Sequence, residues 1–131
     1  FRRVLFRSAP DPGCALPYTQ VDENFYWSGD WNFHYNKLVD VRDYPDRNYV
    51  DGEHLIDYNP HYTYCLNMGY NADCTPGKGS ELFLHCFGPI KPWTGGCVAI
   101  PVDKMKFVMQ HVKPDCVLII DSLQNLGGKI D

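Results

Sequence analysis

The chain has 131 residues, of which 44% are hydrophobic, 15% aromatic and 21% charged. These values are typical of one folded domain with a real core, and the length is too short for two. The net charge is −4 and no basic stripe runs along the chain, so neither nucleic acid nor an anionic membrane is expected as a partner. No apolar run has the length of a membrane span.

The first eight residues, Phe-Arg-Arg-Val-Leu-Phe-Arg-Ser, look foreign to the rest of the chain. They resemble the in-frame translation of a sequencing-adapter end, so residues 1–8 are expected to be non-native and residues 9–131 to form the domain. On this interpretation the natural N-terminus is missing as well. Removing Arg2, Arg3 and Arg7 leaves nine basic against 16 acidic residues and changes the net charge to −7.

The first half of the domain carries weak secondary-structure signals. Residues 9–30 hold three prolines and two glycines, and are expected to be mostly loop with short extended pieces. A short helix or turn is predicted over 35–39. Residues 53–58 are predicted to be a short strand or a helical turn that packs Leu55 and Ile56.

Strand signals strengthen after residue 61. Residues 62–70 alternate with a period of two, which predicts a strand, and further strands are predicted over 82–87 and 97–101. Because successive side chains of a strand point to opposite faces, the second of these strands has two different sides. One face is expected to carry Leu82, Leu84 and Cys86, and the opposite face Phe83, His85 and Phe87.

The C-terminal part contains the one clear helix pattern, over residues 103–113. Asp103 is the expected N-cap and Pro114 ends the pattern. Residues 116–121 are predicted to be a buried strand. Several strands with one clear helix predict a mainly β or α+β class. The apolar positions of the helix recur at spacings of three, four and seven, and are Met105, Val108, Met109 and Val112.

The pattern that indicates chemistry joins the strand over 82–87 to the strand over 97–101. The first strand delivers His85, a loop rich in glycine and proline follows, and Cys97 stands behind Gly95 and Gly96. A thiol is a good nucleophile as thiolate, and a nearby imidazole is the usual means of forming one. Glycines allow backbone N–H groups to surround the thiol, as an oxyanion hole requires. The pattern therefore favours an acyl-transfer enzyme.

Two other interpretations of these residues stay open at this point. Cys97 and His85 are also compatible with a small core residue and a hydrogen-bonded core histidine. A zinc site is disfavoured, because the chain has no paired ligand spacing and Cys86 points away from His85 in a strand. Single buried thiols are expected at Cys65, Cys86 and Cys116, and a disulfide is expected between Cys14 and Cys74, which lie in predicted loops.

The motif resembles the YkuD-like L,D-transpeptidase domain of bacterial cell-wall enzymes. It resembles the branch whose core reads Gly-Ser-x-x-Phe-x-His, a short loop, then Thr-x-Gly-Cys-Val-Ala. The matching residues are Gly79-Ser80, His85, Pro92, Thr94 and Gly96-Cys97-Val98-Ala99. Upstream, the likeness continues in order through Leu16-Pro17-Tyr18, Trp27, Asp30, Tyr35-Asn36-Lys37-Leu38-Val39, Glu53-His54-Leu55 and Gly69-Tyr70-Asn71.

The chain also departs from the family pattern in two ways. Many relatives have serine where Thr94 stands, and arginine where Ala99 stands. Thr94 retains the side-chain hydroxyl of the serine. Ala99 has no charged group, so no residue at that position can take the arginine's role of binding the substrate carboxylate. A Gly-Asp-x-x-Thr-Pro-x-Gly segment that normally follows further strands is missing, so the resemblance implies an N-terminally truncated, partial catalytic domain.

The resemblance implies a mixed β-sandwich and a cysteine-dependent reaction on peptidoglycan stem tetrapeptides, without metal or organic cofactor. The implied roles are Cys97 as nucleophile, His85 as general base, Thr94 as support of their geometry, and Gly95 and Gly96 as oxyanion donors. Substrate contacts are expected at Tyr70, Asn71 and Trp93, although these residues also fit simple packing. The remaining histidines His34, His61 and His111 are expected to be exposed or capping.

The resemblance further implies a location outside the cytoplasm, in the cell envelope, and we expect a monomer. An acceptor amine would resolve the thioester into a cross-link, and water would make the enzyme an L,D-carboxypeptidase. The alternative is a non-catalytic peptidoglycan-binding domain with a degenerate or truncated site.

Overall fold

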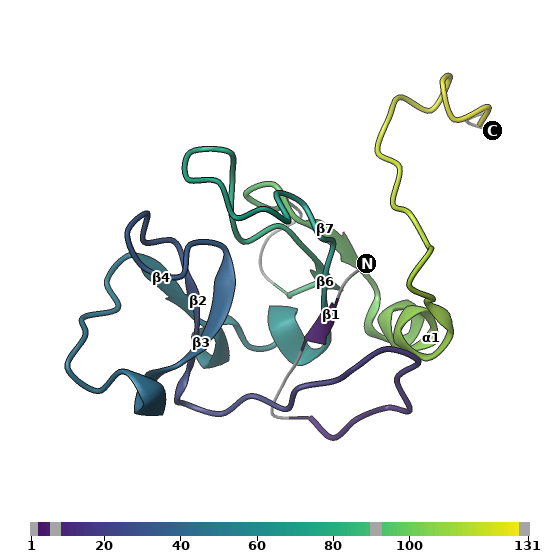
Figure 1. The fold of residues 1–131 in the computed structure, drawn as a ribbon. Helices are drawn as coiled ribbons and strands as arrows, with labels where there is room; N and C mark the ends of the chain where they lie inside the picture. The colour runs from purple at the N-terminus through teal and green to yellow at the C-terminus, as the bar shows by residue number, and fades with distance from the viewer. Residues whose placement is uncertain (1–2, 6–8, 90–92, 129–131) are drawn as a thin grey trace.

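The computed structural model describes residues 3–5, 9–89 and 93–128. Pro92, a residue of the motif, lies outside these ranges. Within them the chain forms two sheets and one α-helix, α1 (Val102–His111) (Figure 1). The structure thus confirms a mainly β, mixed α+β class. No helix in these ranges is long and apolar enough to cross a bilayer.

The larger sheet holds the motif-bearing strands and has the strand order β1-β5-β6-β7. Its strands are β1 (Arg3–Leu5), β5 (Cys65–Asn67), β6 (Phe83–Cys86) and β7 (Val98–Ile100). The first three pair antiparallel, whereas β7 runs parallel to β6. β1 comes from the segment predicted to be non-native, and its pairing with β5 does not bear on the origin of that segment.

The smaller sheet is antiparallel and has the strand order β3-β2-β4. Its strands are β2 (Phe25–Ser28), β3 (Lys37–Asp40) and β4 (Gly52–His54). Short 3₁₀ helices follow at η1 (Val41–Asp43), η2 (Leu55–Tyr58) and η3 (His61–Thr63). A short strand or a helical turn was expected over 53–58, and the structure has the end of β4 followed by η2, with Leu55 fully buried and Ile56 half-buried.

Strand β6 separates two cores, because its alternating side chains point to opposite sides as predicted. The helix-side core comprises Leu16, Tyr64, Leu66, Leu84, Cys86, Met105, Met109 and Val112. The pocket-side core comprises Val21, Trp27, Leu55, Tyr62, Cys65 and Phe83, with Cys97 partly buried against it. The Trp27 and Phe83 rings meet edge to face at 5.0 Å, and this contact joins the smaller sheet to the larger one.

Helix α1 buries the predicted stripe, but its ends differ from the prediction. It begins at Val102 behind Pro101, so Asp103 lies in the first turn and the expectation of an Asp103 N-cap was wrong. A carboxylate in the first turn still interacts favourably with the helix dipole. The helix ends at His111, ahead of Pro114, because the residue before a proline is disfavoured in helical conformation.

Two predicted elements in the middle of the chain needed correction. The strand expected over 62–70 is restricted to β5, because a 3₁₀ helix occupies 61–63 and Gly69 adopts a φ of +74°. The helix or turn expected over 35–39 is mostly strand β3. It follows a turn in which Asn36 takes a left-handed φ of +57°, a conformation that asparagine tolerates better than most residues.

The prediction of a buried strand over 116–121 was wrong. The chain leaves α1 and runs away from the sheets (Figure 1), and Val117, Ile119 and Ile120 are exposed by 67–78%. Apolar, β-branched composition favours a strand only where a partner strand supplies hydrogen bonds. This segment pairs with none in the described chain.

The predictions for the thiols were partly right. Cys65 and Cys86 are buried thiols outside any disulfide, as expected, whereas the Cys116 thiol is exposed. The expected Cys14–Cys74 disulfide does not form: Cys14 packs against the helix-side core, and the Cys74 thiol faces the Asn36 carbonyl.

Candidate active site

The parallel pairing of β6 with β7 brings Cys97 and His85 to one face of the sheet. His85 pairs in register with Ala99, so Cys97, two residues earlier, has the same side-chain direction. Both residues line a cavity of about 310 Å³, which we call the Cys97 pocket. Thr94 and Gly95 line it as well, so four residues of the predicted catalytic set come together.

The Cys97 thiol has two backbone partners in this pocket. It donates to the Glu81 carbonyl at 3.2 Å and accepts from the Phe83 N–H at 3.3 Å. Burial raises the pKa of Cys97, the Phe83 N–H opposes this, and the charges of Glu53 and Glu81 raise it further. The resting group is therefore a neutral thiol at pH 7.

The His85 imidazole is buried and anchored at one nitrogen. Its Nδ1 lies 2.8 Å from the Cys86 carbonyl oxygen, and because a carbonyl only accepts, Nδ1 carries the proton. Burial lowers the pKa of His85, with a smaller contribution from His61. The ring is thus neutral at pH 7, with Nε2 available as a base. To use it, the thiol must turn away from the Glu81 carbonyl.

Thr94 shapes the loop that presents Cys97. Its hydroxyl donates to the Cys97 carbonyl and accepts from the Gly96 N–H at 3.3 Å. It therefore fixes the backbone of the loop, and through it the position of the thiol. Gly96 has a φ of +144°, and a Cβ there would lie 3.2 Å from the Leu82 side chain. An oxyanion would compete with the Thr94 hydroxyl for the Gly96 N–H.

Glu81 lies in the motif, but sequence reasoning assigned it no role. It has a left-handed φ of +62°, which costs a non-glycine residue on the order of 1 kcal/mol or more. Its N–H donates to the Asn36 side-chain oxygen at 3.3 Å, and its carbonyl accepts the Cys97 thiol. A charged residue at the entry to an apolar strand was the signal that could have drawn attention to it.

Asn36 is a buried residue that connects the loops around the site. Its oxygen also accepts from the Trp27 indole at 3.1 Å, and its NH₂ donates to the carbonyls of Tyr70 and Asn71, each at 3.1 Å. It therefore ties the turn before β3 to the segments before β6. This position was noted in the upstream likeness, but without a role.

Three further side chains of the Cys97 pocket come from η2 and η3, upstream of the motif. Tyr62 is 4% exposed, and its ring centroid lies 5.3 Å from that of His85. The His61 ring lies 6.1 Å from His85, so the expectation that His61 is exposed or capping was wrong. Tyr58 stacks on Tyr62 at 4.9 Å. No spacing in the sequence signals that this segment covers the site.

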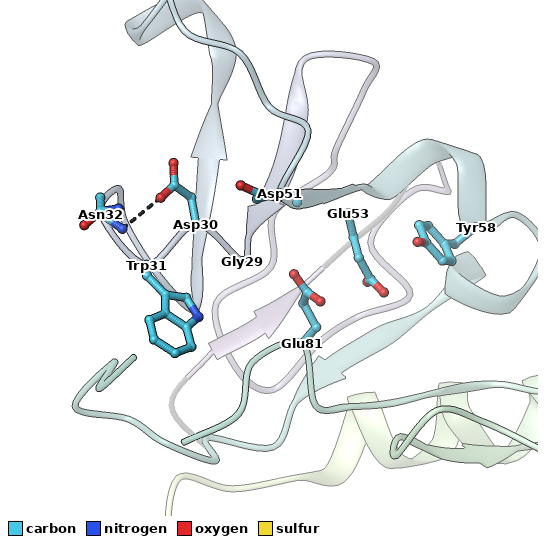
Figure 2. Close-up of a pocket in the computed structure, with 9 residues that line it drawn as sticks. Gly29, Asp30, Trp31, Asn32, Asp51, Glu53, Tyr58 and Glu81 are labelled. Carbon is cyan, nitrogen blue, oxygen red and sulfur yellow. Dashed lines mark hydrogen bonds between the residues drawn. The ribbon is translucent and has the colours of Figure 1, made fainter. Parts of the chain in front are cut away.

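A larger acidic cavity of about 660 Å³ adjoins the Cys97 pocket and shares Glu53, Tyr58 and Glu81 with it. Figure 2 shows Glu53 and Glu81 extending into it from different segments, beside Asp30 and Asp51. Burial raises the pKa of Glu81 to about 7, helped by the Glu53 charge. No three His, Cys, Asp or Glu side chains of the described chain gather as metal ligands.

The expected substrate contacts do not lie in the Cys97 pocket. Tyr70 lines a separate cavity of about 490 Å³ and packs beside Gly79. The Asn71 amide is used within its own loop, where it donates to the carbonyls of Thr75 and Gly79 at 2.9 Å. Trp93 is 69% exposed.

Comparisons with known proteins identify no family for this chain: no protein-family model, no curated protein and no solved structure matches it.

Proposed function

We propose that the chain is a cysteine-dependent L,D-transpeptidase domain with a YkuD-like β-sandwich, acting on peptidoglycan stem tetrapeptides outside the cytoplasm. The observation that carries the proposal is the placement of Cys97 and His85 on one face of two paired strands, lining one pocket. The resemblance of the motif from Gly79 to Ala99 supplies the substrate class.

In the proposed reaction, the Cys97 sulfur attacks the carbonyl of the third residue of the stem peptide, while His85 Nε2 accepts the thiol proton. The bond to the terminal D-alanine breaks, and His85 returns the proton to the leaving amine. Backbone N–H groups at Gly95, Gly96 and Cys97 stabilise the oxyanion, a contribution typically worth about 3 kcal/mol. An acceptor amine then attacks the thioester and restores the thiol.

Acylation by a carbapenem tests this proposal, because in this family the drug reacts with the active thiol. Intact-protein mass should show one adduct on the native chain and on Cys116→Ser, which removes the exposed thiol. Cys97→Ala should show none. An adduct that survives Cys97→Ala, or a native chain without an adduct, would overturn the assignment of the nucleophile.

A non-catalytic peptidoglycan-binding domain is the second candidate. It is favoured by the thiol's hydrogen bond to the Glu81 carbonyl and by the raised pKa of Cys97. Co-sedimentation with purified peptidoglycan separates the two functions. Binding without any adduct, unchanged in Cys97→Ala, would identify the binding domain.

A further inference from the structure

The position of the His85 ring depends on what packs against it. The backbone carbonyl of Cys86 anchors Nδ1, and the rings packed against the imidazole restrict its remaining rotation, and hence the direction of Nε2. Two rings contact it edge to face, Tyr62 at 65° and His61 at 87°.

Tyr62 is the fixed member of this pair of neighbours. It is 4% exposed, and its ring also meets Phe83 edge to face at 5.7 Å. Its hydroxyl donates to Glu53 Oε2 at 2.8 Å. His61 is only half-buried. The Tyr62 ring is therefore held at its hydroxyl end by Glu53 and along its edge by the core.

Glu53 occupies a position that is unfavourable for a carboxylate. It lines both the Cys97 pocket and the acidic cavity, and Figure 2 shows it in the latter. Burial raises its pKa, and hydrogen bonds from the Tyr62 and Tyr58 hydroxyls lower it. Desolvation of this half-buried carboxylate offsets much of what its hydrogen bond with the buried Tyr62 hydroxyl contributes to stability, so the main effect of the bond is on orientation. The orientation it fixes here is that of the ring beside His85.

We propose that Glu53 and Tyr62 are positioning residues for the proposed reaction: the carboxylate fixes the tyrosine, whose ring holds the His85 imidazole with Nε2 directed into the Cys97 pocket. The consequence for acylation rests on the proposed function, whereas the effect on the imidazole does not. Besides Tyr62, the titratable groups that line this pocket or pair with His85 across the sheet are Glu53, Tyr58, His61, Cys65, Glu81 and Cys97.

The test compares Tyr62→Phe, which removes the hydroxyl and keeps the ring, with Glu53→Gln, which keeps an acceptor for that hydroxyl. The matched control is Tyr49→Phe, because the Tyr49 hydroxyl bonds the Tyr44 carbonyl outside the Cys97 pocket. Two quantities are measured on folded protein: the NMR titration and tautomer of His85, and the rate of carbapenem acylation. Thermal unfolding reports the effect on stability.

Tyr62→Phe should alter the titration midpoint or tautomer ratio of His85. It should also slow acylation about tenfold, which is the factor that corresponds to the loss of one hydrogen bond to a charged group. Glu53→Gln should slow acylation only two- to threefold, and Tyr49→Phe should change neither quantity. An unchanged His85 titration in Tyr62→Phe would overturn the proposal, as would equal effects in Tyr49→Phe. If Tyr62→Phe does not fold, Glu53→Gln decides by the same His85 titration. If native protein forms no adduct, the proposed function fails, and the titration still decides this proposal.

Discussion

The two faces of strand β6 differ in what they contain. The helix-side face carries Leu84 and Cys86 into a core of apolar side chains, one tyrosine ring and a thiol. The pocket-side face carries Phe83 and His85 toward a core that opens into a cavity with ionisable groups. One alternating strand thus faces an apolar core on one side and a cavity with ionisable side chains on the other.

The pocket-side face carries electrostatic costs that the helix-side core largely avoids. Burial lowers the pKa of His85, and raises those of Cys97 and Glu81. In each case the neutral form is favoured, as expected where water is partly excluded. A residue in the left-handed region, Glu81, adds backbone strain at the same place. The comparison predicts that substitutions on the two faces separate activity from stability.

The largest effect is expected for His85→Ala. Loss of a general base typically reduces the rate by 10²–10⁴-fold, so acylation of Cys97 should slow by about that factor. The unfolding free energy should change much less than the activation barrier. Acylation followed by intact-protein mass, with urea unfolding of the same sample, measures both. A His85→Ala variant that acylates at the native rate would remove His85 from the mechanism.

Leu66→Ala tests the opposite face. Leu66 is fully buried in the helix-side core, and truncating such a leucine typically costs about 2–5 kcal/mol through lost burial and a cavity. The urea midpoint should fall accordingly, while the folded protein acylates at the native rate. Leu118→Ala, a more exposed leucine on the C-terminal segment, is the matched control and should shift the midpoint little. A slowed rate in folded Leu66→Ala would show that the two faces are coupled.

A smaller and pH-dependent effect is expected for Glu81→Gln. The carboxyl has a pKa of about 7 in the fold against an ordinary 4.5, so the folded chain binds more protons than the unfolded chain between these values. Its contribution to stability is therefore present below pH 4.5 and lost as the pH rises to 7. The variant should gain about 1 kcal/mol at pH 8, less than the full shift implies because the side chain keeps some solvent contact.

Urea unfolding of Glu81→Gln at pH 4 and pH 8 measures this difference. At pH 4 the gain should be absent. Glu23→Gln, at an exposed glutamate, is the matched control. Equal effects of Glu81→Gln at both pH values would show that the carboxyl titrates normally in the folded chain.

The same comparison explains how far the sequence predicts the structure. Period-two alternation was enough to assign both faces of β6, and the motif was enough to place His85, Thr94, Gly95 and Cys97 in one pocket. These are local signals. Glu53 and Tyr62 come from an upstream segment, and no periodicity states which distant loop will cover a given face. The sequence therefore predicted Cys97 and His85 as a pair, but it did not predict that the side chains of Glu53 and Tyr62 line the same pocket.

The C-terminal segment shows the converse limit. Ile119 and Leu66 are both apolar residues in runs that predict strands, yet Leu66 is 0% exposed and Ile119 67%. Composition gives a preference for extended structure, but burial depends on a partner that only the fold supplies. Ile119→Lys should therefore change the unfolding free energy by less than about 0.5 kcal/mol, as is usual for exposed positions. A loss of several kcal/mol, measured by urea unfolding, would show instead that this segment packs as a strand in solution, because a lysine buried without a partner is strongly destabilising.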